Sequence, residues 1–191
     1  MVLLAAFLVA ISANLQAQGP SKEEMMKSWE AYMTPGSIHK MIAMSDGVWN
    51  EEITMWMDPS APPTKSKAKA TNKMILGGRY QESKHVGTFD GKPFEGYSVL
   101  AYDNAKKVFQ STWIDNMGTG MMYLEGTWDE PKKTIHFKGN CVDPMSGQDM
   151  MVREEFTIID DNNQKLMMYM TMPGQPEVKT MEITLKRAGK L

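Results

Sequence analysis

From Val48 onward the sequence has no segment with a convincing helical period, and this constrains the fold more than any other feature. Short runs of aromatic, β-branched and methionine residues alternate there with polar residues, as in strands that have one dry face and one wet face. In the clearest run, Met181, Ile183 and Leu185 share one face, and polar residues occupy the other. The pattern predicts an extended antiparallel sheet.

Turn signals divide this region into about ten strands. Gly77-Gly78 and Asp90-Gly91 supply the positive-φ positions of tight hairpins, and Pro131 and Pro173-Gly174 interrupt any central ladder. The expected strands are 48–57, 66–76, 79–87, 95–103, 107–115, 119–128, 133–140, 149–159, 164–172 and 177–187. Sequential hairpins with no helices to cover them favour an up-and-down antiparallel β-barrel over a sandwich.

Two short helices are expected before the barrel. Ser21 and Glu24 form a capping box at the start of an amphipathic segment that reaches Met33, and Pro35-Gly36 ends it. A second helix is expected to begin at Ser37. The fold class is therefore all-β with short N-terminal helices: a helical segment at 18–47 and a barrel domain at 48–188.

Residues 1–17 are predicted to be a secretory signal peptide. The segment has no charged side chain, and the apolar run from Val2 to Ile11 is too short to span a bilayer comfortably. Small residues place a cleavage site near Ala17, although no Lys or Arg precedes the run. The alternative is a buried N-terminal helix. Cleavage predicts a periplasmic or secreted protein with no integral membrane segment.

The net charge, the single cysteine and the absence of known motifs limit the classes of function that fit this sequence. The formal net charge of −2 provides no broad basic field for nucleic acid. Cys141 is the single cysteine, so no intrachain disulfide can form, and a structural role is expected for it. There is no Ser-His-Asp order, Glu-x-x-His helix or Gly-rich phosphate loop, so no catalytic residue, metal ligand or cofactor is assigned.

Gly47-Val48-Trp49 opens the first expected strand directly after a short helix. A Gly-x-Trp at this place resembles the signature of the lipocalin and calycin superfamily. In that superfamily the Trp plugs one end of the barrel and a basic residue from the last strand packs over it. The resemblance implies this role for Trp49, with Lys186 or Arg187 as its cationic neighbour.

A second resemblance covers nearly the whole chain after the expected signal. The segments that carry it occur in the order His39-Lys40-Met41, Gly47-Val48-Trp49, Leu76-Gly77-Gly78-Arg79-Tyr80, Phe94-Glu95-Gly96, Tyr102-Asp103 and Trp113-Ile114-Asp115. They resemble the bacterial family known as domain of unknown function fifteen-seventy-nine, which is similar to calycins in its predicted barrel. The resemblance implies a calycin-like fold and export, and no settled activity.

Methionine is the outstanding compositional bias, with 20 residues, about twice the usual share. Met168, Met170 and Met172 share one strand face, and Met55 and Met57 share another with Trp49. Because Met is flexible and polarisable, we expect an apolar barrel cavity lined partly by methionines. Ordinary core packing and a thioether copper(I) site are the alternatives.

The candidate ligand-binding residues are Trp49, Glu51, Ile53, Met55, Arg79, Trp113, Tyr123, Met168 and Met170. Glu51 shares a face with apolar residues and, if buried, needs a partner, for which Arg79 or Arg153 is expected. Such a pair would orient a ligand's polar head, or it would have the purely structural role of joining strands at the floor of the barrel. By analogy with haem-holding calycins, His85 or His136 is a candidate axial ligand, whereas His39 is expected to orient its helix.

Three functions fit this sequence. The leading hypothesis is an exported barrel that binds an apolar or amphipathic small molecule by burying its apolar surface. The second is an enzyme that uses the same cavity, with Glu51 as its candidate titratable group. The third is a structural or interaction protein whose barrel is packed solid.

Overall fold

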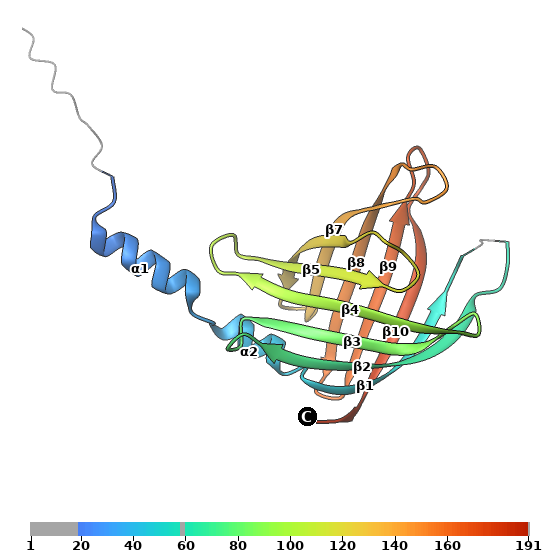
Figure 1. Ribbon diagram of the computed structural model, residues 1–191, viewed down its shortest axis with the longest axis horizontal. Helices are drawn as coiled ribbons and strands as arrows, with labels where there is room; N and C mark the ends of the chain where they lie inside the picture. Colours follow the sequence, from blue (N-terminus) through green and yellow to red (C-terminus); the bar gives the residue numbers. More distant parts are fainter. Residues whose placement is uncertain (1–18, 58–59, 191) are drawn as a thin grey trace, which may run out of the picture.

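The computed structural model describes residues 19–57 and 60–190, so the expected signal peptide lies outside the described residues. Two helices precede ten strands (Figure 1). The helices are α1 (Lys22–Met33) and α2 (Ser37–Ala43). The strands are β1 (Gly47–Met55), β2 (Thr64–Ile75), β3 (Tyr80–Phe89), β4 (Lys92–Asp103), β5 (Val108–Asp115), β6 (Met122–Asp129), β7 (Thr134–Val142), β8 (Asp149–Asp160), β9 (Asn163–Thr171) and β10 (Val178–Gly189).

The strands form a closed antiparallel barrel in which each strand pairs with its neighbours in sequence. Closure is made by β1 and β10, whose register sets Trp49 opposite Arg187 and Ile53 opposite Ile183. The predicted up-and-down barrel is confirmed, and the expected strand boundaries agree with the observed ones to within three residues. The agreement follows from side-chain alternation, because the polar and apolar periods mark each strand directly.

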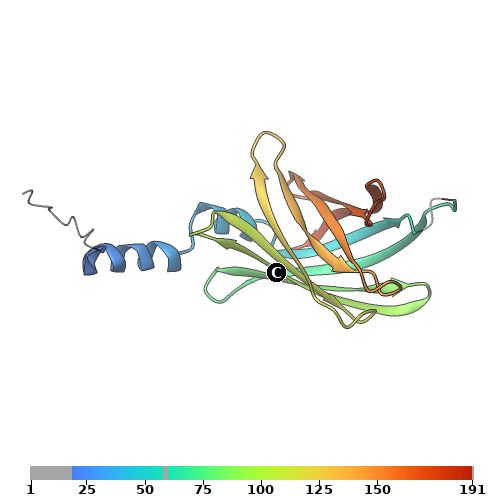
Figure 2. The ribbon, with the colours of Figure 1, turned by 90° about the horizontal axis from the view of Figure 1, so that it is seen from above.

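The two ends of the barrel differ. Helix α2 lies against one end, here called the α2 end, where its Ile42 joins the buried cluster of Phe109, Leu124, Ile135 and Phe137 (Figure 2). The β2–β3, β4–β5, β6–β7 and β8–β9 turns lie at this end. The other five connections lie at the opposite end, here called the mouth. One end is therefore plugged by a helix that burial holds in place.

Trp49 is the centre of the plug and is fully buried. Its indole Nε1 donates to the Ser45 carbonyl oxygen at 2.9 Å, and the Arg187 guanidinium lies 4.2 Å from the ring centroid. The same guanidinium donates to the carbonyl oxygens of Met44, Asp46 and Asp161. The expected cationic neighbour of Trp49 is thus Arg187, which ties the last strand to the α2 end.

Gly47 explains the glycine of the Gly-x-Trp motif. Its φ of 135° is a region that L side chains rarely adopt, and a Cβ there would lie 2.5 Å from the Gly189 carbonyl oxygen. The close approach is the point at which β1 begins beside the end of β10. A side chain at this position would push apart the strands that close the barrel.

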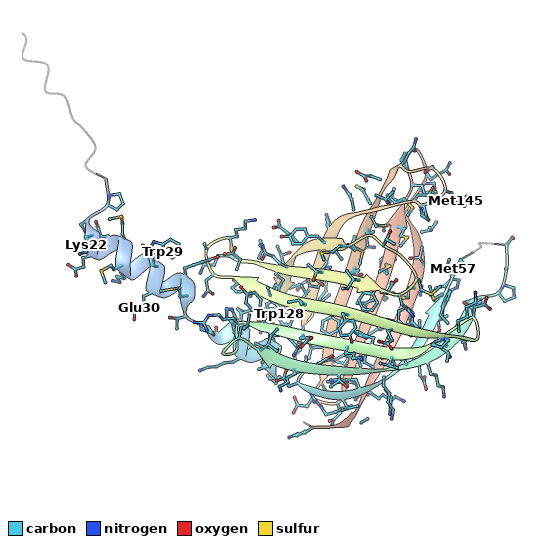
Figure 3. All side chains as sticks on the ribbon, in the orientation of Figure 1. Lys22, Trp29, Glu30, Met57, Trp128 and Met145 are labelled. Atoms are coloured by element: carbon cyan, nitrogen blue, oxygen red, sulfur yellow. The ribbon has the colours of Figure 1, made fainter. Side chains whose placement is uncertain are left out.

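Helix α1 extends away from the barrel, and Trp29 on it is exposed (Figure 3). Its last turn is fixed by the barrel: the Asn104 side-chain amide donates to the carbonyls of Ala31, Tyr32 and Thr34. The capping box at its start is present as expected. Among the described residues, no helix is both long and apolar enough to cross a membrane.

Candidate functional site

Inward-facing side chains on the mouth side of the barrel are partly exposed. By strand register, the inward-facing residues Ala70, Gln81 and Leu185 lie toward the α2 end and are buried. Inward-facing residues nearer the mouth are only partly buried: Ile53, Met55, Trp113, Met122, Met150, Met168, Met170, Met181 and Ile183. The part of the interior that these partly exposed side chains line, on the mouth side of the plug, is here called the lumen; Met122, Met168 and Met170 in it also pack against the buried core.

Methionines gather at the mouth. Met55, Met122, Met150, Met170 and Met181 are inward-facing residues of five different strands near this end, and they are called the mouth methionines below. Their shared position follows from side-chain alternation on strands of matched register. They give the entrance an apolar, adaptable wall.

Further methionines lie in the connections at the mouth. Met57 and Met145 lie at the end of the barrel away from α2 (Figure 3). A hollow of about 410 Å³ between the β7–β8 and β9–β10 connections is lined by Met145, Met150 and Met172, among others. The methionine bias of the sequence is therefore concentrated around the entrance as well as in the wall of the lumen.

A polar pair lies at mid-height in the lumen. Glu51 is 2% exposed, and its two carboxylate oxygens lie 3.1 and 3.2 Å from His85 Nδ1. The Trp113 ring meets the His85 ring edge-on with centroids 5.0 Å apart, and Phe94 stacks on Trp113. A hydrogen-bonded ring nitrogen and an aromatic contact fix the orientation of the imidazole.

Gly96 makes room for this arrangement. A Cβ at Gly96 would lie 2.6 Å from the Trp113 ring carbons, closer than real Cβ atoms come. The Trp113 ring is held from its other side, since Nε1 donates to Asp115 Oδ2 at 2.7 Å. The aromatic wall beside His85 thus depends on the absence of one side chain on β4.

The expected partners of Glu51 are wrong. Arg79 lies at the α2 end, where it donates to the carbonyl oxygens of Leu76 and Met33. Arg153 faces outward on β8 and pairs with Glu155 and Glu177. The prediction of an arginine partner was wrong because charge does not decide which residue faces Glu51. That depends on which side chains of each strand point inward and on how far along the barrel axis they lie.

The remaining candidates divide between the plug, the lumen and the outer face. Trp49 belongs to the plug, and Ile53, Met55, Trp113, Met168 and Met170 line the lumen. Tyr123 faces outward, and its hydroxyl donates to Glu125 Oε1 at 2.7 Å.

The three histidines lie in different surroundings. His136 is on the outer face, within 3.6 Å of Asp129 and 3.9 Å of Glu155, so only His85 of the two haem candidates faces the lumen. His39 holds the start of α2, because its Nδ1 accepts from the Gly36 amide, and burial lowers the pKa of its imidazole. The role expected for His39, orienting its helix, agrees with these contacts.

Glu154 is the site residue that the sequence reasoning missed. It is an inward-facing residue of β8 between Phe137 on β7 and Met168 on β9, and it is 7% exposed. Its carboxyl makes no hydrogen bond or ion pair with any described residue, and burial raises its pKa to about 7. A buried carboxyl without a partner is costly in its ionised form.

Residues 19–57 and 60–190 contain no cluster of three His, Cys, Asp or Glu side chains suited to a metal ion. Cys141 faces the interior, and burial, followed by the charges of Asp149 and Asp143, raises the pKa of its thiol. A raised pKa keeps the thiol protonated and weakly nucleophilic.

Comparison with known proteins agrees with this fold. The crystal structure of Rv2717c from M. tuberculosis is similar at 14% identity, with 81% of this chain and 99% of that chain covered and a TM-score of 0.60. A redesigned β-barrel is less similar, at 16% identity over 76% of this chain and 93% of that one, with a TM-score of 0.39. No curated protein matches the sequence. The family model described as "Protein of unknown function (DUF1579)" matches residues 34–187, and the chain therefore belongs to this family.

Proposed function

We propose that the protein binds an apolar or amphipathic small molecule in its lumen. The observation that carries the proposal is the partial exposure of inward-facing apolar side chains from β1, β5, β6, β8, β9 and β10 on the mouth side of the plug. A solid core would bury such side chains. A ligand that covers them gains about 25 cal/mol for each Å² of apolar surface removed from water.

The composition of the wall suits a ligand of adaptable shape. Mouth methionines have unbranched, polarisable side chains that can follow an irregular apolar surface. Below them, the Glu51–His85 pair and Glu154 provide a few polar groups in an otherwise apolar space. Predominantly apolar walls with a small number of placed polar groups are typical of small-molecule sites.

Titration with the neutral fluorophore N-phenyl-1-naphthylamine tests the proposal. Ligand-stripped protein should enhance its fluorescence saturably, and Met170→Trp, which fills the lumen, should weaken binding about tenfold. Met151→Trp is the matched control, because Met151 is the neighbouring mouth-side position on β8 and is 62% exposed on the outer face. Absence of saturable binding, or equal losses in both variants, would contradict a lumen site.

We also propose that residues 1–17 direct export to the periplasm or the exterior. Support comes from the uncharged apolar run followed by small residues near Ala17. Intact-mass measurement of the mature protein from its host should give a chain that begins close to residue 18. A mature chain that retains Val2 to Ala17 would contradict export by cleavage.

A further inference from the structure

We propose that the lumen selects amphiphiles with a cationic head group and that Glu154 is the residue that binds this head. This inference rests on the proposed function and names the class of ligand for the same site. It starts from Glu154, which faces inward, is 7% exposed and makes no hydrogen bond or ion pair with any described residue. Its carboxyl oxygens are not among the fully buried unpartnered atoms of the described residues, so a ligand in the lumen can reach them.

The charge balance of the interior favours a cation. Register assigns two carboxylates to the lumen, Glu51 and Glu154, and His85 pairs with Glu51 alone. Asp115 and Asp143 add carboxylates on the mouth side, and both accept hydrogen bonds from backbone amides of their own loops.

The described lysines and arginines offer little to offset these charges. The inward-facing Arg187 is committed to the plug, where it binds three carbonyl oxygens and covers Trp49. Lys92, the first residue of β4, is exposed at the rim. On the other strands, the described lysines and arginines alternate to the outer face, as in β2, where the inward positions are Ala68, Ala70 and Asn72. An anionic head in the lumen would face two carboxylates without a counter-charge.

The immediate surroundings of Glu154 suit an organic cation. Phe137 and Met168 lie directly across from it on the two flanking strands, at a separation where side chains touch. An aromatic face and a polarisable thioether both contact alkylammonium groups favourably. A cation there supplies the missing ion-pair partner and favours the ionised carboxylate, which burial alone disfavours.

The arrangement also orients the ligand. Glu154 lies deeper than the mouth methionines, since Met150 precedes it on β8 at the mouth and Met170 follows Met168 toward the mouth on β9. A head bound at Glu154 therefore leaves its apolar tail among Met150, Met170 and Met181. The polar part of the ligand enters first, and the tail fills the entrance.

Competition among three dodecyl compounds tests this selection. Dodecyltrimethylammonium, dodecanol and dodecanoate, each below its micellar concentration, would displace N-phenyl-1-naphthylamine from the stripped protein at pH 8. The cation should displace it at about tenfold lower concentration than dodecanoate, with dodecanol between them. In Glu154→Gln the affinity for dodecyltrimethylammonium should fall about tenfold, while the affinity for dodecanol should change less than about twofold.

Matched variants locate the effect. Glu52→Gln removes the same charge from an exposed position on the outer face of β1. This variant should bind the three dodecyl compounds with the same order of affinity as the wild type. Retention of the cation preference in Glu154→Gln with its loss in Glu51→Gln would place the head at Glu51 and overturn the assignment. Dodecanoate binding as tightly as the cation would overturn the inference while the proposed binding function stands. Failure of all three compounds and of the fluorophore would refute the proposed function itself.

Discussion

Replacement of Glu154 by glutamine should stabilise the protein at pH 8 and have much less effect at pH 5. The pKa of the Glu154 carboxyl rises from 4.5 to about 7 on folding because burial disfavours its charged form. The folded state therefore binds the proton more tightly than the unfolded state, and stability falls as pH rises between these two values. At 1.36 kcal/mol for each unit, the full cost is about 3 kcal/mol, of which about 2.5 kcal/mol develops between pH 5 and pH 8.

Other groups act in the same range, so the test compares two proteins. The pKa of His39 is lowered on folding by burial, so its contribution runs the other way: stability is lost as pH falls below about 6.5. Asp129 and Asp160, whose hydrogen bonds lower their pKa values, contribute only at more acidic pH. Both effects are present in the wild type and in the variant, and they cancel in the difference.

Urea unfolding of ligand-stripped protein, followed by tryptophan fluorescence at pH 5, 6, 7 and 8, measures this difference. The gap between Glu154→Gln and the wild type should widen by about 2.5 kcal/mol from the lowest to the highest pH. Glu52→Gln, exposed on the outer face, should give a gap that does not change with pH. A flat gap for Glu154→Gln, constant to about 0.5 kcal/mol, would refute the reasoning that the carboxyl is buried without a partner.

Three further predictions concern the plug, the aromatic wall and the first helix. Arg187→Leu should lower the free energy of unfolding by about 3 kcal/mol, measured in urea, because it leaves three carbonyls without their charged donor and removes the cation over Trp49. Gly96→Ala should force the Trp113 ring from its place and change tryptophan emission; an unchanged spectrum would contradict the close contact. Asn104→Ala should speed hydrogen exchange in the last turn of α1 without altering exchange in the barrel.

The sequence predicted the barrel well because its signals are local. Alternation marks each strand, Gly77-Gly78 and Asp90-Gly91 mark turns, and all four of these turn residues adopt positive φ as hairpins require. The basic cover over Trp49 was an implication of the resemblance to the Gly-x-Trp signature, which left Lys186 and Arg187 as candidates, and Arg187 is the residue observed. Local pattern therefore defines the fold, and the resemblance supplied its plugged end.

The site was harder to predict because it depends on the relative height and facing of distant strands. The sequence indicated that Glu51 would need a partner if its face were interior. Glu51 is buried, and its partner is His85, brought across from β3 by a register that charge does not determine. Glu154 is in phase with Val152 and Phe156, which is a signal for an inward position. It was obscured because Arg153 and Glu155 on either side are also charged, so the run looks like a solvated segment.

Closure by β1 and β10 joins residues near the two ends of the described chain, with Trp49 opposite Arg187. A chain that lacks β10 cannot complete the ladder, so closure must wait until this strand has left the ribosome. Removal of β10 would leave the edges of β1 and β9 unpaired, which invites self-association. Late completion also gives a newly made chain time to cross a membrane before it becomes compact, which accords with the proposed export.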